Sequence, residues 1–160
     1  MNLKVEEGVN AQPEEILKVV DSAKEIVAGV DAGKVDPERS GVYRSTGVRL
    51  EVVPADERAM PVYICVRGKD DIVVGIMHGA HEHFNSSHSA SEITEKALGF
   101  FKSLLHSTQQ ISLKLKDGKV FSKEILFKLG DELVSEYSDK ELLLTVFGSV
   151  TSESHEFSFI

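Results

Sequence analysis

Three short strand-like runs between residues 48 and 77 constrain the fold most, because the connections between them are short. The run Val48–Val52 alternates apolar and polar side chains, as a half-buried strand does. Residues 62–66 are apolar on both faces, which is typical of a central strand, and residues 72–77 follow after a polar turn. Parallel neighbours need a crossover of about a dozen residues or more. The sequence therefore predicts an antiparallel meander.

Two amphipathic helices are expected on either side of this meander. The first begins at Pro13, since a proline in the first turn leaves no hydrogen bond unmade, and apolar residues then recur at helical spacing up to Gly29. The second begins with Ser89-Ala90-Ser91-Glu92, which matches a capping box, and its apolar stripe runs to Leu105. Each stripe is wide enough to cover one face of a sheet.

A β-hairpin is expected after the second helix, with its turn at Asp117-Gly118. A two-residue loop would place a core-facing residue opposite a solvent-facing one. A three-residue loop with Gly118 in a left-handed conformation places Leu113 opposite Phe121 and keeps the apolar face together. We prefer the second register.

The C-terminal segment has two interpretations. Residues 138–141 match a capping box and would begin a helix, whereas residues 142–147 have the β-branched and aromatic composition of a strand. The choice between helix and strand stays open for residues 139–147. We prefer strands at 142–147 and 155–160, the second as a closing strand.

These elements predict a single α+β domain over residues 1–160, a length typical of one domain. The order α-β-β-β-α-β-β, followed by two more strands, predicts a mainly antiparallel sheet of about five to seven strands with two main helices packed on it. This order is similar in outline to that of small acidic secretion chaperones. Small acidic α+β folds also occur among immunity proteins, and no motif assigns the chain to either class.

The charge balance argues against nucleic acid as the partner. The formal net charge is −8 at pH 7, from 26 acidic and 18 basic residues, and such a surface repels phosphate backbones. No apolar run is long enough to span a membrane. The single cysteine, Cys65, forms no intramolecular disulfide, and the first residues do not match a signal peptide. We therefore expect a cytoplasmic protein.

One segment concentrates metal-ligand chemistry. It contains His78, His81 and His83, with His88 close behind. Imidazole is the commonest metal ligand in proteins, and His81 and His83 would point the same way in an extended segment. With His78 as third ligand and one open position, they would suit a catalytic zinc ion. The alternative is a solvated polar loop between a strand and a helix, because the spacing matches no zinc motif.

Acidic residues in predicted loops form a second candidate site. Asp56, Glu57, Asp70 and Asp71 could together present a partner-binding surface, and the alternative is an ordinary solvated surface. No pair of carboxylates has the spacing of a general acid/base dyad.

The leading hypothesis is a non-enzymatic protein-binding module, either an inhibitor of the immunity type or a chaperone-like adaptor. It requires no cofactor, and its partner is another protein, for which a basic charge would complement the acidic surface. A second copy of the chain is a further candidate partner, paired at a sheet edge. Two other classes stay open: a small metal-dependent hydrolase that uses the histidine cluster with zinc, and a small-ligand carrier with a cavity between sheet and helices.

Overall fold

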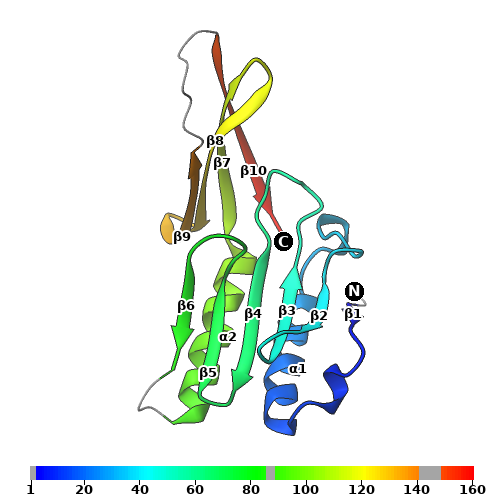
Figure 1. The fold of residues 1–160 in the computed structure, drawn as a ribbon. Coiled ribbons are helices and arrows are strands. Elements are labelled where there is room, and N and C mark those ends of the chain that lie inside the picture. The colour runs from blue at the N-terminus through cyan, green and yellow to red at the C-terminus, as the bar shows by residue number, and fades with distance from the viewer. Residues whose placement is uncertain (1–2, 86–88, 141–148) are drawn as a thin grey trace.

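The computed structural model describes residues 3–85, 89–140 and 149–160 (Figure 1). Its elements, in chain order, are β1 (Lys4–Val5), the 3₁₀ helix η1 (Val9–Ala11), α1 (Glu14–Ala28), the 3₁₀ helix η2 (Ala32–Lys34), β2 (Gly41–Arg44), β3 (Val48–Val52), β4 (Val62–Gly68), β5 (Asp71–Ile76), β6 (His81–Phe84), α2 (Ala90–His106), β7 (Thr108–Lys116), β8 (Lys119–Leu129), β9 (Glu132–Lys140) and β10 (Val150–Ser158). The predicted α+β class is confirmed. The strands form two sheets, ordered β1-β2-β3-β4-β5-β6 and β10-β7-β8-β9.

The predicted meander forms the centre of the six-stranded sheet. Strands β3, β4 and β5 pair antiparallel, with Leu50 opposite Ile64 and Ile64 opposite Val74. Strand β2 pairs antiparallel with β3, and β6 pairs antiparallel with β5. The two-residue β1 pairs parallel with β2, so this sheet is mixed.

Both α-helices pack on the same face of the six-stranded sheet. Helix α1 contacts β3 and β4, and α2 contacts β4, β5 and β6. Figure 1 shows these strands in front of the two helices. The side chains between the layers are fully buried, among them Leu50, Ile64 and Val74 from the sheet and Phe101 from α2. Burial of such a side chain stabilises the fold by about 1.5–3 kcal/mol.

The helix boundaries agree with the predicted capping signals. Helix α1 begins directly after Pro13 and ends before Gly29. Helix α2 follows Ser89, whose backbone N–H donates to the Glu92 carboxylate at 3.2 Å, and the capping box is complete. None of the helices in the described part of the chain is long and apolar enough to cross a membrane.

The hairpin between β7 and β8 differs from the prediction. Its loop has two residues, Asp117 and Gly118, both with positive φ (52° and 77°), and Lys116 pairs with Lys119. Two residues with positive φ characterise the turn whose twist matches that of the flanking strands. The predicted three-residue loop is therefore wrong.

A β-bulge next to this turn shifts the register again. Ser122 lies opposite Lys114, whereas Val120 lies opposite Leu115, so β8 carries one extra residue. Farther along the hairpin, the buried residues Ile111 and Ile125 lie opposite each other. The bulge thus aligns the apolar faces that the longer loop was expected to align.

The C-terminal strand forms one edge of the four-stranded sheet. Strand β10 pairs antiparallel with β7 from Val150 to Ser158, and Phe159 behind it is fully buried. The strand predicted at 155–160 is thus present but begins earlier. Residues 138–140 belong to β9 rather than to the start of a helix. The strand predicted at 142–147 lies outside the described residues.

The four-stranded sheet extends from the end of the six-stranded sheet at which β4 begins (Figure 1). The two sheets meet at the turn between β5 and β6, where a Cβ on Gly79 would lie 2.9 Å from the ring of Tyr137 on β9. They also meet where the loop before β4 contacts β7 and β10. Side chains from both sheets therefore line the junction.

Candidate functional site

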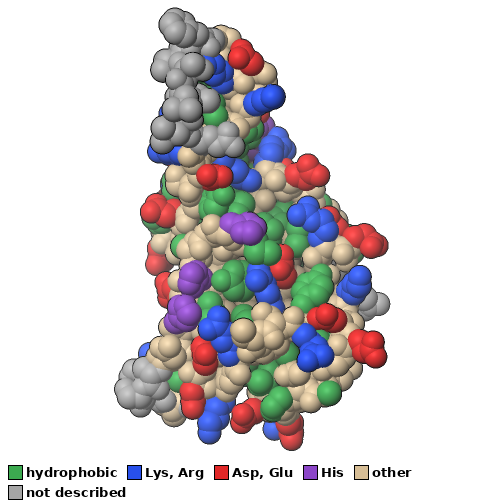
Figure 2. Space-filling view, viewed as in Figure 1, with side chains coloured by type: hydrophobic (Ala, Val, Ile, Leu, Met, Phe, Trp, Pro, Cys, Tyr) green, Lys and Arg blue, Asp and Glu red, His purple; other side chains and the backbone are tan. Residues whose placement is uncertain are grey.

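The face of the six-stranded sheet opposite α1 and α2 carries several chemically versatile side chains. One row of cross-strand partners consists of Tyr43, Arg49, Cys65, Val73 and His83. The adjacent row consists of Gly41, Glu51, Tyr63, Gly75 and His81. Because side chains alternate along a strand, both rows point away from the helices. We call this surface the open face; Figure 2 shows histidine, basic, acidic and apolar side chains gathered over it.

Arg49 lies at the centre of the open face and is held by three contacts. Its guanidinium carbon lies 4.1 Å from the centroid of the Tyr63 ring, and Nη2 lies 2.9 Å from the Met77 sulfur. Its Nε lies 3.2 Å from Glu51 Oε2 but makes no hydrogen bond with any described residue, so this contact is an ion pair without hydrogen-bond alignment. A cation–π contact of this kind contributes about 0.5–1 kcal/mol when partly exposed. The result is a planar cation fixed against an aromatic ring.

Glu51 beside it is a poorly solvated carboxyl group, with a side chain that is 12% exposed. Burial raises the pKa of Glu51, and the positive charges of Arg49 and Arg39 only partly offset this effect. Glu51 therefore takes up a proton more readily than a free glutamate does. Burial also raises the pKa of Tyr63, which favours a neutral hydroxyl on the same face.

A hollow of about 210 Å³ lies at the end of the open face, where the two sheets meet. Its charged or titratable lining comes from both sheets: Arg39, Glu51, Asp56, Glu57, His78 and Lys123. Strand β8 contributes Lys123. Burial lowers the pKa of the Lys123 ammonium, and the negative charges of Asp56 and Asp139 partly offset this effect. The hollow thus combines poorly solvated groups of both charges, which suits the recognition of a polar group that enters it.

The three candidate metal ligands lie in two places. His81 and His83 belong to the edge strand β6, so the loop interpretation is wrong for this half of the segment and holds only for the turn that contains His78. Their rings are both exposed, with centroids 5.1 Å apart and planes at 67°. His78 lies in the preceding turn with φ 57° and lines the hollow. Within the described ranges, no three His, Cys, Asp or Glu side chains form a metal-binding group. The three-histidine site stays a prediction, and His88 lies outside the described residues.

The four candidate acidic residues lie at opposite ends of β4. Asp56 and Glu57 precede the strand and line the hollow, whereas Asp70 lies in the turn after it and Asp71 begins β5. Arg58 donates to Asp56 from Nε at 2.8 Å and from Nη2 at 2.7 Å, and these bonds lower the pKa of Asp56. A single partner-binding surface made by all four residues stays a prediction, and its two halves are separated by the length of a strand.

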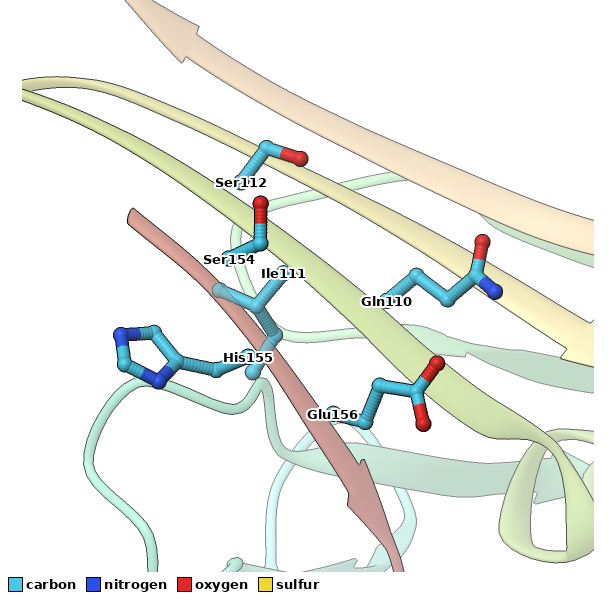
Figure 3. A pocket seen from close by; sticks show the side chains of 6 residues that line it. All are labelled: Gln110, Ile111, Ser112, Ser154, His155 and Glu156. Atoms are coloured by element: carbon cyan, nitrogen blue, oxygen red, sulfur yellow. The ribbon is translucent and has the colours of Figure 1, made fainter. Parts of the chain in front are cut away.

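A second hollow, of about 270 Å³, lies over β7 and β10 (Figure 3). Ser112 lies opposite Ser154 and Gln110 opposite Glu156, so these four side chains share one face of the sheet. The close-up shows His155 pointing away from them, and its ring lies 2.8 Å from Arg58 Nη1. This hollow is polar but lacks the paired charges of the first, which makes it the weaker candidate.

Sequence reasoning missed the residues at the centre of the open face. Arg49 and Glu51 occupy the polar positions of the run predicted as a half-buried strand, and that alternation was the available signal. Tyr63 lies in a run apolar on both faces, and Lys123 reaches the hollow from β8. No local pattern brings either of them to Arg49 or Glu51.

Comparison with family models, curated proteins and solved structures gives no match to the chain. The function is therefore inferred from the chemistry of the open face. This face offers a fixed arginine on a tyrosine, a methionine, two exposed histidines and a hollow with groups of both charges. Such groups can bind a partner by stacking, ion pairing and hydrogen bonding.

Proposed function

We propose that this protein is a non-enzymatic protein-binding module, of the inhibitor or adaptor type, that binds another protein through the open face. The observation that carries the proposal is the contact of Arg49 with Tyr63 at 4.1 Å, on the sheet face opposite α1 and α2. Arginine and tyrosine are enriched among the residues that dominate binding energy at protein interfaces. An arginine already held in place loses less side-chain entropy on binding.

The charge of the molecule supports a protein partner with basic groups. The net charge of −8 favours encounter with a positively charged surface and raises the association rate. Glu51, Asp56 and Glu57 line the hollow, and Asp56 is already paired with Arg58. The other two carboxyl groups would favour a basic side chain of the partner there. The hollow is small enough to take one side chain rather than a folded element.

Capture from a native lysate tests the proposal when variants are compared. Wild-type protein is expected to retain a partner in stoichiometric amount, and Tyr63→Ala is expected to weaken its affinity roughly tenfold or more. Tyr63→Phe keeps the ring under Arg49 and should retain the partner. Lys96→Ala, on the exposed side of α2, is the matched control. Equal capture by wild type and Tyr63→Ala would remove the open face as the binding surface.

The two other classes have narrower support. A metal-dependent hydrolase on His78, His81 and His83 would need His78 to join the pair on β6, and it predicts a tightly held zinc ion. A small-ligand carrier would need a cavity between sheet and helices, and it predicts ligand-dependent thermal stabilisation. Catalytic activity without a protein partner would favour the hydrolase over the proposed function. Small-molecule binding without a protein partner would favour the carrier.

A further inference from the structure

We propose that His81 and His83 bind one divalent transition-metal ion as a two-residue chelate on β6, and that His78 is not one of the ligands. This inference is independent of the protein-binding function. It rests on the placement of the two imidazoles, on their free ring nitrogens and on the way β5 supports them.

The two rings lie on the same side of β6, two residues apart. Their centroids are 5.1 Å apart and their planes meet at 67°. A zinc–nitrogen bond is about 2.0–2.1 Å long, so two nitrogens on one ion are at most about 4.2 Å apart. The nitrogens lie on the ring edges, so rings at this centroid distance can present one nitrogen each within that limit.

The ring nitrogens are available for coordination. No described residue forms a hydrogen bond or an ion pair with His81 or His83, and their one recorded side-chain interaction is with each other. Both side chains are exposed, so an ion does not have to enter the protein interior. Glu82 between them lies opposite Val74 and points to the other face of β6.

Strand β5 holds the pair in position. His81 lies opposite Gly75 and His83 opposite Val73. A Cβ on Gly75 would lie 2.6 Å from the Cβ of His81, so the glycine is what allows this close approach. Ligands held on a paired strand lose less conformational freedom when the ion binds.

The chemistry selects the class of ion. Imidazole suits Zn²⁺, Cu²⁺ and Ni²⁺, and among them affinity is highest for Cu²⁺. Hard ions such as Mg²⁺ prefer oxygen ligands and are not expected to bind. Two protein ligands leave further coordination positions open to water or to a group from a partner.

Calorimetric titration of untagged full-chain protein with Cu²⁺, Ni²⁺, Zn²⁺ and Mg²⁺ tests this assignment. The expected result is uptake of one transition-metal ion per chain and no uptake of Mg²⁺. His81→Ala and His83→Ala should each weaken binding by roughly 10²-fold, because a single imidazole loses the chelate effect. His78→Ala should bind as the wild type does, and thermal unfolding shows whether each variant is folded.

Each other outcome overturns the assignment. Equal loss in His78→Ala would show a three-histidine site. Unchanged binding in His81→Ala and His83→Ala would show adventitious uptake elsewhere on the chain. A second readout follows the imidazole ring protons by NMR: under this assignment the first equivalent of Zn²⁺ shifts the signals of His81 and His83 and leaves that of His78 in place.

Discussion

The side-chain amide of Gln109 makes two hydrogen bonds with the backbone of Met60. Gln109 Nε2 donates to the Met60 carbonyl oxygen at 3.0 Å, and Gln109 Oε1 accepts from the Met60 N–H at 2.7 Å. Gln109 is fully buried in β7, whereas Met60 lies in the loop that leads into β4. One side chain thus satisfies both backbone groups of a buried residue where the two sheets meet.

Replacement of Gln109 by alanine is expected to destabilise the protein strongly. The change leaves the Met60 N–H and carbonyl unpaired in a site without solvent, and each unsatisfied group costs about 1–3 kcal/mol. The expected loss from the two groups is therefore about 2–6 kcal/mol of unfolding free energy, measured by urea denaturation.

Gln110→Ala is the matched control for this prediction. Gln110 lies on the opposite face of β7, half-buried and opposite Glu156, so its removal should cost about 0.5 kcal/mol or less. Similar losses in both variants would contradict the structural role assigned to the Gln109 amide.

Phe159 should be the most sensitive apolar position in the last ten residues. Its ring is fully buried and lies edge-on to Phe157 at a centroid distance of 4.9 Å. Its backbone carbonyl accepts a hydrogen bond from Asp31 at 2.9 Å. Phe159→Ala is expected to cost about 3–5 kcal/mol by thermal or urea unfolding. Ile160→Ala, at an exposed side chain, should change stability little, and a large effect there would be at odds with this packing.

Two glycine-to-alanine changes should act in opposite directions. At Gly75 a Cβ would stand 2.6 Å from the Cβ of His81 and from the Ala80 carbonyl oxygen, so Gly75→Ala must displace β6, at a cost of about 1–3 kcal/mol. At Gly99, on the exposed side of α2, no atom beyond the adjoining residues and the nearby helix backbone lies within 4 Å of the new Cβ. Gly99→Ala should stabilise the protein by roughly 1 kcal/mol through helix propensity. Differential scanning calorimetry separates the two signs.

The elements predicted correctly from the sequence are those whose signal is local. Pro13 and the capping box at Ser89 mark the starts of α1 and α2. The alternation in Val48–Val52 marks a strand with one face against the helices. Each of these signals depends on neighbouring residues along the chain, so no tertiary information is needed to detect them.

Two of the strands that sequence reasoning missed, β6 and β9, have little buried apolar surface. Strand β6 (His81–Phe84) and strand β9 (Glu132–Lys140) lie at sheet edges, and most of their side chains are exposed or half-buried. Backbone pairing to β5 and β8 holds them in place, and such pairing leaves no period-two apolar pattern in the sequence. The histidine segment therefore carries no strand signal in the sequence.

The predicted register of the hairpin is wrong for a different reason. The prediction assumed regular pairing from the turn onward, and then only a three-residue loop aligns the apolar faces of the two strands. The structure combines a two-residue turn with a bulge in β8, and together these two features align the apolar faces of the strands. A bulge is set by packing against the rest of the molecule, which a hairpin sequence alone does not contain.

Glu51 gives stability a pH dependence whose sign follows from burial. Because burial raises the pKa of Glu51, the folded protein holds this proton more tightly than the unfolded chain does. Stability is then lost as the pH rises from the unfolded carboxyl pKa, about 4.3, through the raised folded value. Glu51→Gln removes this titration, so the unfolding free energy of the variant should increase relative to wild type across that window.

The opposite sign is expected at Glu124, which makes a matched comparison. Glu124 is exposed and ion-paired with Lys140 at 3.0 Å, and this partner lowers the pKa of Glu124. The contribution of the pair is present above the unfolded carboxyl pKa and is lost as the pH falls through the lowered one, although solvent screening keeps it small. Glu124→Gln should therefore lose stability relative to wild type as the pH rises, while Glu51→Gln gains.

Urea unfolding of the three proteins in buffers from about pH 3 to pH 8 measures both trends, since free carboxyls titrate near the lower end of that range. Parallel curves for the two variants would mean that the burial of Glu51 does not control its titration.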